Sequence, residues 1–347
     1  MSFRLIILIQ VTCLFAAYII SSCKRKDPQY PVNNQEAVSL TPYKIKYPAH
    51  FPDMVIPDDN KPYKERIDLG RMLYYDVNLS NDGRACATCH LQSYGFTVPG
   101  MVKEMPVLSH VNMGWYKNFM WDGSKTGGLE EVMQFETREF FATDLAKINN
   151  IAKYKTLFKN AFGVDNITYK EIGYALAQFA RTMISGDSKY DRYMRGEQPL
   201  SPAEESGMNL FFTEKGDCFH CHTVMTTTDN SFHNTGLDSI YVKEMDKGYY
   251  NVTRNPEDLG KFKTPNLRNV ALREHYMHDG RFTTLEQVIN FYNSGVHKVG
   301  TLDPIMTKPG KEHGLRLTEE EKFQLVAFLK TLTDSTFLTN KEFSQPE

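Results

Sequence analysis

The 347-residue sequence lacks an excess of charge of either sign, because 40 Lys and Arg residues are balanced by 42 Asp and Glu residues. Proteins that bind nucleic acid by neutralising its phosphates carry a surplus of basic residues, so nucleic acid is excluded as a partner. Cysteine is also scarce. Six cysteines are too few for a secreted scaffold that depends on disulfides, so their positions matter more than their number.

The chain also lacks a hydrophobic run long enough for a stable membrane span. Its apolar stretch from Leu5 to Ile20 follows Arg4 and gives way to small residues and then to charge, which is the layout of a secretory signal. Ile20-Ser21-Ser22-Cys23 resembles a bacterial lipobox, in which the cysteine sulfur receives the lipid. We therefore predict a lipoprotein signal peptide over residues 1–22 and a periplasmic protein of a Gram-negative-type envelope, anchored to the membrane through Cys23. An uncleaved N-terminal anchor helix is the alternative.

Long alternation of apolar and polar residues, which is typical of strands, is absent as well, and the fold is predicted to be mainly α. Residues 23–63 contain recurrent prolines without helical periodicity and are predicted to form a tether or irregular segment. Thr168 to Ile184 keeps apolar residues at helical spacing, so we expect a core helix there, capped by Asn166. Capping boxes are expected at Ser201–Glu204 and Thr318–Glu321.

The sequence does contain one five-residue motif twice. Cys86-Ala87-Thr88-Cys89-His90 and Cys218-Phe219-His220-Cys221-His222 both have the pattern C-x-x-C-H. Two thiols three positions apart on a helical turn can add to the two vinyl groups of one haem, and the next residue offers an imidazole to the iron. Two covalently bound haem c groups are therefore predicted, one at each motif.

Zinc binding and thiol redox chemistry compete with haem for these cysteines. A zinc ribbon usually separates its cysteine pairs by about 15–20 residues, whereas Cys218 follows Cys86 by 132 positions. A thioredoxin-like site does not need a histidine after both pairs. The repeated motif instead predicts two duplicated cytochrome c-like haem domains with irregular loops, at residues 64–190 and 191–347, and the segment from Gly186 to Pro199 is the expected connector.

Further stretches, in matching order along the chain, resemble the bacterial dihaem cytochrome c peroxidase family, which includes the MauG-like enzymes. The resemblance implies that peroxide is activated at the N-terminal haem, held by His90, and that the C-terminal haem, held by His222, relays electrons. Besides the two motifs, the stretches that carry the resemblance are Leu73-Tyr74-Tyr75-Asp76, Leu79-Ser80-Asn81-Asp82-Gly83, Phe119-Met120-Trp121-Asp122-Gly123, Phe232-His233-Asn234-Thr235-Gly236-Leu237, Thr264-Pro265-Asn266-Leu267-Arg268-Asn269-Val270 and Tyr276-Met277-His278-Asp279-Gly280-Arg281-Phe282.

The resemblance also assigns roles to aromatic residues. Trp121 matches the family tryptophan that lies between the haems and relays electrons, whereas Trp115 has no such match and is expected to be structural. The relay iron is expected to have a second axial ligand. In the family this ligand lies one helix after the element that matches His278-Asp279-Gly280, and counting onward without gaps reaches Tyr292, a ligand of the MauG type. Met277 is the competing thioether ligand.

Two departures from the family concern the peroxide site. Residues 91–105 contain no histidine that could block the first iron, and His110 is the nearest candidate for a removable ligand. The family's acid/base glutamate corresponds to Ala142. Glu139 or Glu136 would have to replace it in moving a proton from one peroxide oxygen to the other.

The resemblance bears on haem orientation and on calcium. His233 and His278 match family elements that are expected to orient haem propionates or loops, with Arg268 and Arg281 as charge partners. Glu104 stands where the family has an asparagine near an interhaem calcium ion. A carboxylate still suits calcium, so a calcium site is left open.

Together these residues predict a peroxidase that reduces hydrogen peroxide to water with electrons from a small periplasmic donor, either a cytochrome c or a cupredoxin. One alternative is a MauG-like dihaem oxidase that acts on a protein partner, which Tyr292 favours. The other is a non-catalytic dihaem electron carrier, which Ala142 favours. A homodimer is left open.

Overall fold

Residues 38–311 and 314–347 are described by a computed structural model of the chain. The predicted signal peptide, Cys23 with its predicted lipid, and the first part of the predicted tether lie outside these residues. The described part of the tether has little regular structure and is held to the rest of the chain at Thr41, whose carbonyl accepts from the N–H of Lys64 at 2.9 Å. Within the described ranges, no helix is long and apolar enough to cross a bilayer.

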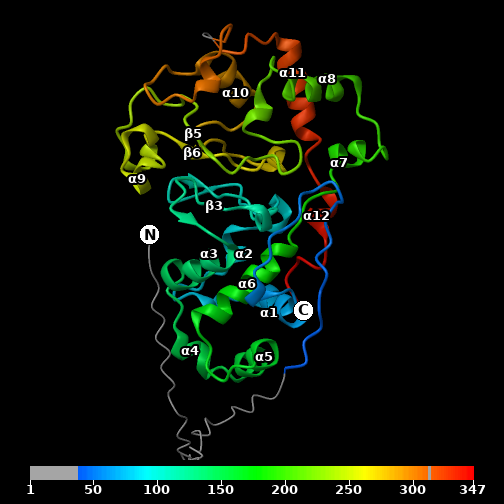
Figure 1. Cartoon of the computed structure of the whole chain (residues 1–347), viewed down its shortest axis with the longest axis vertical. Coiled ribbons are helices and arrows are strands. Elements are labelled where there is room, and N and C mark those ends of the chain that lie inside the picture. Colours follow the sequence, from blue (N-terminus) through cyan, green and yellow to red (C-terminus); the bar gives the residue numbers. More distant parts are fainter. Residues whose placement is uncertain (1–37, 312–313) are drawn as a thin grey trace, which may run out of the picture. The chain divides into compact units, whose positions relative to one another are not determined.

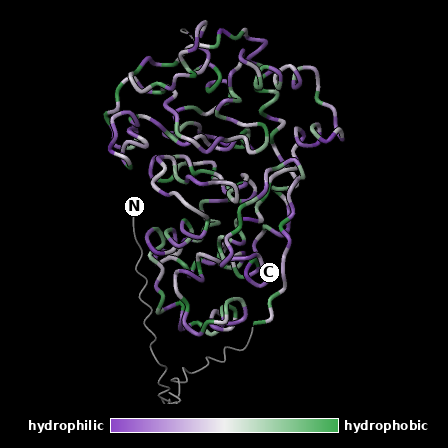
Figure 2. Tube along the Cα trace, viewed as in Figure 1, coloured by the Kyte–Doolittle hydropathy of each residue, from purple (hydrophilic) through white to green (hydrophobic). Residues whose placement is uncertain are grey.

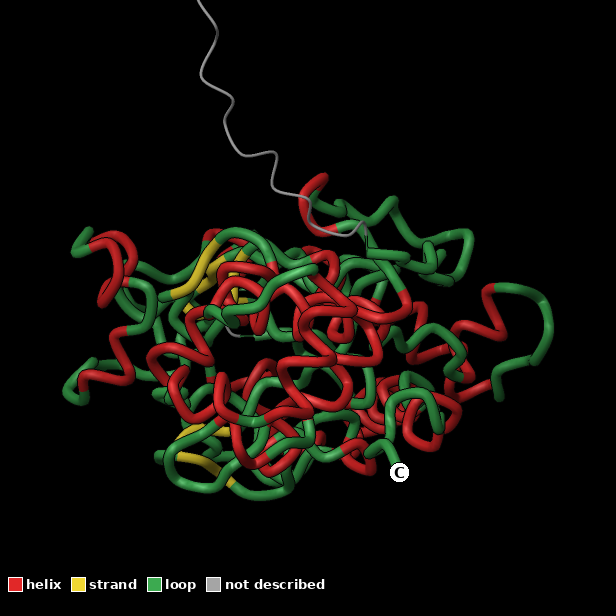
Figure 3. The backbone as a smooth tube through the Cα atoms, turned by 90° about the horizontal axis from the view of Figure 1, so that it is seen from below, coloured by secondary structure: helices red, strands yellow, loops and turns green. Residues whose placement is uncertain are grey.

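The described residues are mainly helical, as predicted, and long loops join the helices (Figures 1 and 3). The helices up to the connector are α1 (Lys64–Tyr74), α2 (Cys86–Cys89), α3 (Leu129–Phe135), α4 (Leu145–Asn150), α5 (Ala152–Phe162) and α6 (Tyr169–Thr182). The remaining helices are α7 (Lys189–Met194), α8 (Pro202–Phe211), α9 (Tyr250–Thr253), α10 (Leu285–Asn290), α11 (Glu319–Lys330) and α12 (Ser335–Thr339).

The strands form short antiparallel pairs of two residues each. The pairs are β1 (Met101–Val102) with β2 (Met105–Pro106), β3 (Asn118–Phe119) with β4 (Lys125–Thr126), and β5 (Phe232–His233) with β6 (Phe262–Lys263). Two π-helical turns, Glu136–Phe140 and Phe291–Gly295, directly follow α3 and α10.

The first of two hydrophobic cores lies where α1 and α3 pack on α6. Leu73 of α1 and Phe179 of α6 are fully buried in it. Gly70 lets α1 and α6 approach closely, because a Cβ at this position would collide with the backbone carbonyl of Ala175. This close contact fixes the position of α1, the helix that precedes the first C-x-x-C-H motif.

The second core repeats the arrangement with α8 and α11. Phe211 of α8 and Phe328 of α11 are buried in it. A Cβ at Gly207 would collide with the carbonyl of Gln324. A glycine therefore again allows the helix that precedes a motif, here α8, to pack closely against another helix, here α11. The division into two duplicated haem domains remains a prediction.

The helix starts follow the sequence signals with one exception. The expected core helix is confirmed as α6, but the expected cap at Asn166 is wrong. Thr168 caps this helix, since its hydroxyl accepts from the first turn and Glu171 completes a capping box. The capping boxes at Ser201–Glu204 and Thr318–Glu321 are confirmed.

The C-terminal segment returns to the first core. Phe337 and Phe343 belong to that core, and the Tyr75 hydroxyl donates to the Phe343 carbonyl at 2.6 Å. Just before α12, the Asp334 carboxylate accepts from the backbone N–H of Gly186 at 3.0 Å. Hydrophobic residues are distributed along the whole described chain, which is consistent with a core in each half (Figure 2).

Candidate functional site

The first C-x-x-C-H motif forms one helical turn, α2. The N–H of His90 donates to the carbonyl of Cys86 at 3.0 Å, so the cysteines and the histidine share this turn. Cys86 and Cys89 are partly buried and are not joined in a disulfide. Burial raises the pKa of the Cys86 thiol, and the nearby charge of Glu136 raises it further.

The imidazole of His90 is held in the state that a metal ligand needs. Its Nδ1 lies 2.9 Å from the carbonyl oxygen of Phe96, so Nδ1 donates its proton there and Nε2 keeps a free lone pair. Burial lowers the pKa of His90 to about 4, so the ring is neutral at neutral pH. Phe96 has a φ of 59°, a left-handed conformation that is uncommon for a residue with a side chain.

His222 repeats this arrangement in the second motif. Its N–H donates to the carbonyl of Cys218 at 2.9 Å, and its Nδ1 lies 3.0 Å from the carbonyl oxygen of Thr227. Burial lowers the pKa of His222 to about 4. Thr227 has a φ of 52°, an outlier for a β-branched residue. Both histidines are therefore positioned by carbonyls of residues in the left-handed region.

A cavity of about 600 Å³ lies beside the second motif. Cys218, Cys221 and His222 line it together with apolar side chains such as Phe211 and Leu329. Cofactor sites typically have volumes of about 300–1,000 Å³ and mostly apolar walls. The residues present therefore fit a haem at this position, because two free thiols and a ligand nitrogen border one apolar space.

The two predicted candidates for the second axial ligand both line this cavity. Tyr292 lies in the π-helical turn after α10, and Met277 has a left-handed φ of 67°. Burial raises the pKa of Tyr292, and the charges of Cys221 and Cys218 raise it further. The choice between the two ligands remains a prediction.

Trp121 lies between β3 and β4 and also lines the cavity of His222. Its indole Nε1 donates to the Pro106 carbonyl at 2.8 Å, and its own carbonyl accepts from the N–H of Lys263 at 2.9 Å. Trp115 instead packs edge-on against Phe51 at 5.4 Å between ring centres. The structure therefore brings Trp121 to the second motif and leaves Trp115 in a packing role.

The structure separates the two candidate acid/base residues. The Glu139 side chain is 53% exposed and accepts from Arg138 at 2.9 Å. Glu136 is partly buried, and burial raises its pKa to about 7 against the opposing influence of Lys125. Of these two glutamates, Glu136 is the one that interacts electrostatically with Cys86 in the first motif.

His110 lies against the ring of His90. The two ring centres are 3.4 Å apart with an angle of 15° between the rings, and Nδ1 of His110 lies 3.1 Å from the Tyr74 hydroxyl. Two imidazoles on opposite sides of one metal ion, each with a bond of about 2.0 Å, would have ring centres roughly 6 Å apart. This stacking does not place His110 as a second ligand of the iron that His90 would hold.

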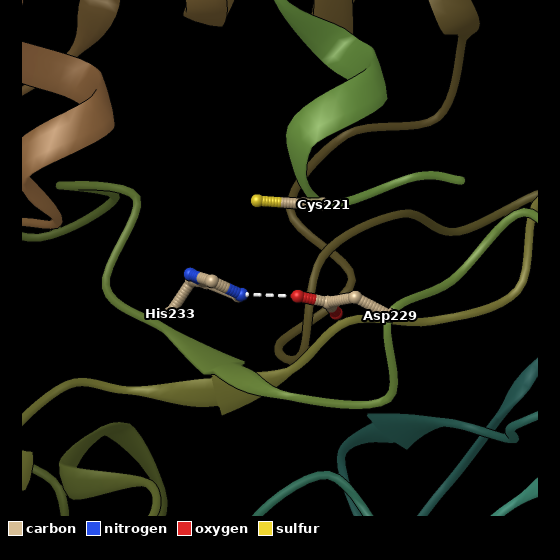
Figure 4. A group of neighbouring side chains, drawn as sticks. All are labelled: Cys221, Asp229 and His233. Atoms are coloured by element: carbon tan, nitrogen blue, oxygen red, sulfur yellow. Dashed lines mark hydrogen bonds and ion pairs between the residues drawn. The ribbon is translucent and has the colours of Figure 1, made fainter.

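His233 lies near Cys221 and faces Asp229 (Figure 4), and Asp303 contacts its other ring nitrogen. Its Nε2 lies 2.8 Å from Asp229 and its Nδ1 lies 2.5 Å from Asp303. Burial acts to lower the pKa of His233, but the hydrogen bonds to both carboxylates prevail and raise the pKa to about 12. The ring is therefore cationic, and both of its nitrogens are engaged.

The predicted charge partners of haem propionates have carboxylates of their own. Arg268 is buried and binds Asp191 through both Nη atoms at 2.6 and 2.8 Å. Arg281 binds Asp238 and Asp279. The cations Lys263 and Arg273 also border the cavity, and the sequence gives no sign of this because neither residue lies in a recognisable motif.

Within the described ranges, three groups of potential metal ligands have their atoms close together. None of these three groups contains two cysteines, and none contains the exposed Glu104. The groups are Cys221–Asp229–His233, Glu214–Asp217–His220 and Asp238–Asp246–His278.

Comparisons with known proteins agree on one family. The family model described as di-haem cytochrome c peroxidase matches residues 64–199. The chain is 31% identical to the cytochrome-c peroxidase IdrP1 of Pseudomonas sp. (strain SCT), over 86% of this chain and 88% of that protein. It is 30% identical to the methylamine utilization protein MauG of Methylorubrum extorquens, over 91% of each chain.

Two solved structures are also similar. A MauG-like protein associated with microbial copper homeostasis has a TM-score of 0.79 and 33% identity, over 88% of this chain and 99% of that one. The diheme peroxidase BthA from Burkholderia thailandensis E264 has a TM-score of 0.66 and 22% identity, over 83% and 91% of the two chains, and supports the fold alone.

Proposed function

Because the chain belongs to the di-haem cytochrome c peroxidase family, we propose that it reduces hydrogen peroxide to water at the first motif, with electrons that enter at the second. Family membership makes the protein a haem-dependent oxidoreductase of the peroxidase type with two haems. One peroxide, two electrons and two protons give two waters. The observation that carries the proposal is the matched pair of histidines, each with Nδ1 on a carbonyl and Nε2 free to bind a metal.

The proposal includes covalent attachment of one haem through the two cysteines of each motif. When bound, haem would supply an iron that changes oxidation state and can bind peroxide. His90 and His222 would hold the irons through Nε2, and Tyr292 is the side chain proposed as the further ligand at the second motif. The neutral, hydrogen-bonded state of both histidines supports these roles.

Proton movement requires a side chain that accepts a proton from one peroxide oxygen and returns it to the other. Glu139 is the residue predicted from the sequence, but its side chain is exposed and bound by Arg138. Glu136 is the better candidate, because a partly buried carboxyl group with a pKa of about 7 both takes and releases protons near neutral pH. A carboxyl group with this pKa supports a peroxidase over the non-catalytic carrier that Ala142 favours.

Electrons are proposed to pass by Trp121, whose indole lies on the wall of the second cavity and donates to Pro106. The proposed donor is a small cytochrome c or cupredoxin in the periplasm. The lipid on Cys23, the calcium ion near Glu104 and the homodimer belong to the same proposal and rest on the sequence alone.

A MauG-like oxidase that acts on a protein partner is the second candidate. Tyr292 at the second cavity favours it, as does the similarity to MauG of Methylorubrum extorquens. A peroxidase and a MauG-like oxidase share the haem sites. They differ in the molecule that is oxidised, which is the small electron donor in the first case and a protein partner in the second.

Steady-state reduction of hydrogen peroxide by the purified two-haem protein, with reduced cytochrome c or cupredoxin, tests the proposed function. We expect turnover, and we expect spectra with one high-spin and one low-spin haem. Absence of turnover with every donor would contradict a peroxidase. Two haems that stay low-spin after partial reduction would contradict an open iron at His90.

A further inference from the structure

Four lysine and arginine side chains border the cavity of the second motif, together with His233, whose charge is balanced by Asp229 and Asp303. Lys298 is exposed to solvent, and Lys311 pairs with Asp217 at 2.6 Å. Lys263 and Arg273 differ, because within the described part of the chain neither forms an ion pair with a carboxylate. The described residues thus leave two cations at an apolar cavity without a carboxylate partner.

Lys263 is the more buried of these two cations, with 3% of its surface exposed. Its Nζ donates to the Thr264 carbonyl at 3.2 Å and lies 5.2 Å from the centre of the Tyr116 ring. Burial lowers the pKa of Lys263 to about 8; Asp229 opposes this effect and Arg273 adds to it. An ammonium group in this setting is costly unless an anion approaches it.

Arg273 lines the cavity of the second motif and also acts electrostatically on His90 of the first. One Nη atom donates to the Val107 carbonyl at 2.6 Å, next to the Pro106 carbonyl that accepts from Trp121. Its charge lowers the pKa values of both His90 and Lys263, so it acts on residues of both sites. Burial lowers the pKa of Arg273 itself to about 10, partly offset by Tyr276.

We propose that Lys263 and Arg273 form the anion site for the carboxylates of the bound haems, beside Trp121 at the second cavity. Lys263 binds a carboxylate of the haem at His222, and Arg273, which acts on both His90 and Lys263, contributes positive charge to both motifs. The inference rests on the haem binding proposed above. Lys263 and Arg273 thereby take the role predicted for Arg268 and Arg281, whose charges are neutralised by carboxylates of the chain itself.

Midpoint potentials test the assignment without any measurement of peroxide turnover. A ferric haem carries one more positive charge than a ferrous haem, so a nearby cation disfavours the ferric state and raises the potential. We expect Lys263→Met to lower the potential of the low-spin haem more than that of the high-spin haem, and Arg273→Met to lower both. Lys263→Arg should restore the wild-type value, because it keeps the charge.

The control is Lys298→Met, the same change at an exposed lysine of the same cavity, which should leave both potentials unchanged. Haem content per chain is measured for every variant. Loss of one haem in Lys263→Met with retention of both in Lys263→Arg would support the assignment. Unchanged potentials in two-haem Lys263→Met and Arg273→Met, or an equal shift in Lys298→Met, would overturn it, and either result leaves the proposed peroxidase reaction standing.

Discussion

At the scale of single residues, the orientations of His90 and His222 depend on two backbone carbonyls, and the residues that carry these carbonyls have unfavourable backbone conformations. Phe96 and Thr227 both adopt left-handed φ angles, which cost of order 1–3 kcal/mol each. Each carbonyl accepts the Nδ1 proton of a histidine, which fixes the tautomer and leaves Nε2 for a metal. Strained residues at matching places after both motifs therefore orient the two histidines that are proposed as metal ligands.

Glu136 gives a prediction that separates it from Glu139. Glu136→Gln should lower peroxide turnover by about 10²–10⁴-fold, the usual contribution of a positioned acid/base group. In the wild type, kcat/KM should fall as the pH drops below about 7, because a protonated Glu136 cannot accept the proton of peroxide. Glu139→Gln is the matched control and should keep wild-type turnover, since its side chain is exposed. Equal losses in the two variants would refute the assignment.

The second axial ligand gives a spectroscopic prediction. Tyr292→Met should raise the midpoint potential of the low-spin haem, because a thioether replaces a harder oxygen donor, and should change its absorption spectrum. Met277→Leu should leave both unchanged. The opposite pattern, with a shift in Met277→Leu alone, would assign the thioether as the ligand.

At the scale of elements, an alanine at Gly207, where α8 crosses α11, has two opposing effects on the free energy of unfolding. Gly→Ala within a helix ordinarily stabilises by roughly 0.5–1 kcal/mol. At Gly207, however, the added Cβ meets the carbonyl of Gln324, and overpacking costs about 1–3 kcal/mol. Gly207→Ala should therefore lower the free energy of unfolding in denaturant titrations.

The control for this crossing is Gly300→Ala, where a Cβ would meet open space at an ordinary φ. Its free energy of unfolding should stay within about 0.5 kcal/mol of the wild type. A stabilised Gly207→Ala variant would mean that helix propensity outweighs the close approach of the two helices.

Elements whose signals are local were predictable from the sequence, and those that depend on distant contacts were not. The helix from Thr168 and the boxes at Ser201 and Thr318 follow from neighbouring residues. The burial of Lys263 could not be read from the sequence, because it depends on Tyr116, far away along the chain. The preference for Glu136 over Glu139 likewise depends on the π-helical turn after α3.

At the scale of the whole molecule, the described residues belong to one compact unit although they contain two cores. The chain leaves the first core through the connector, builds the second, and returns with α12 to the first. Gln92, close to His90 in the sequence, donates to the carbonyl of Asn340 at 2.8 Å. The C-terminal segment therefore couples the surroundings of the first motif to the end of α11.

Asp334 is where this coupling can be tested. Its buried carboxylate accepts from the Ser185 hydroxyl at 2.9 Å and from the N–H groups of Gly186 and Asp187 at 3.0 Å each. In the wild type, the absorption bands of both haems should shift in one coincident transition on denaturation, because the two cores are coupled. Asp334→Ala leaves these donors unsatisfied, at about 1–3 kcal/mol for a buried group, and should split the shift into two transitions. Asp144→Ala removes only the cap of α4, at about 1 kcal/mol, and should lower stability without splitting it. Coincident transitions in Asp334→Ala would show that the two cores are coupled elsewhere.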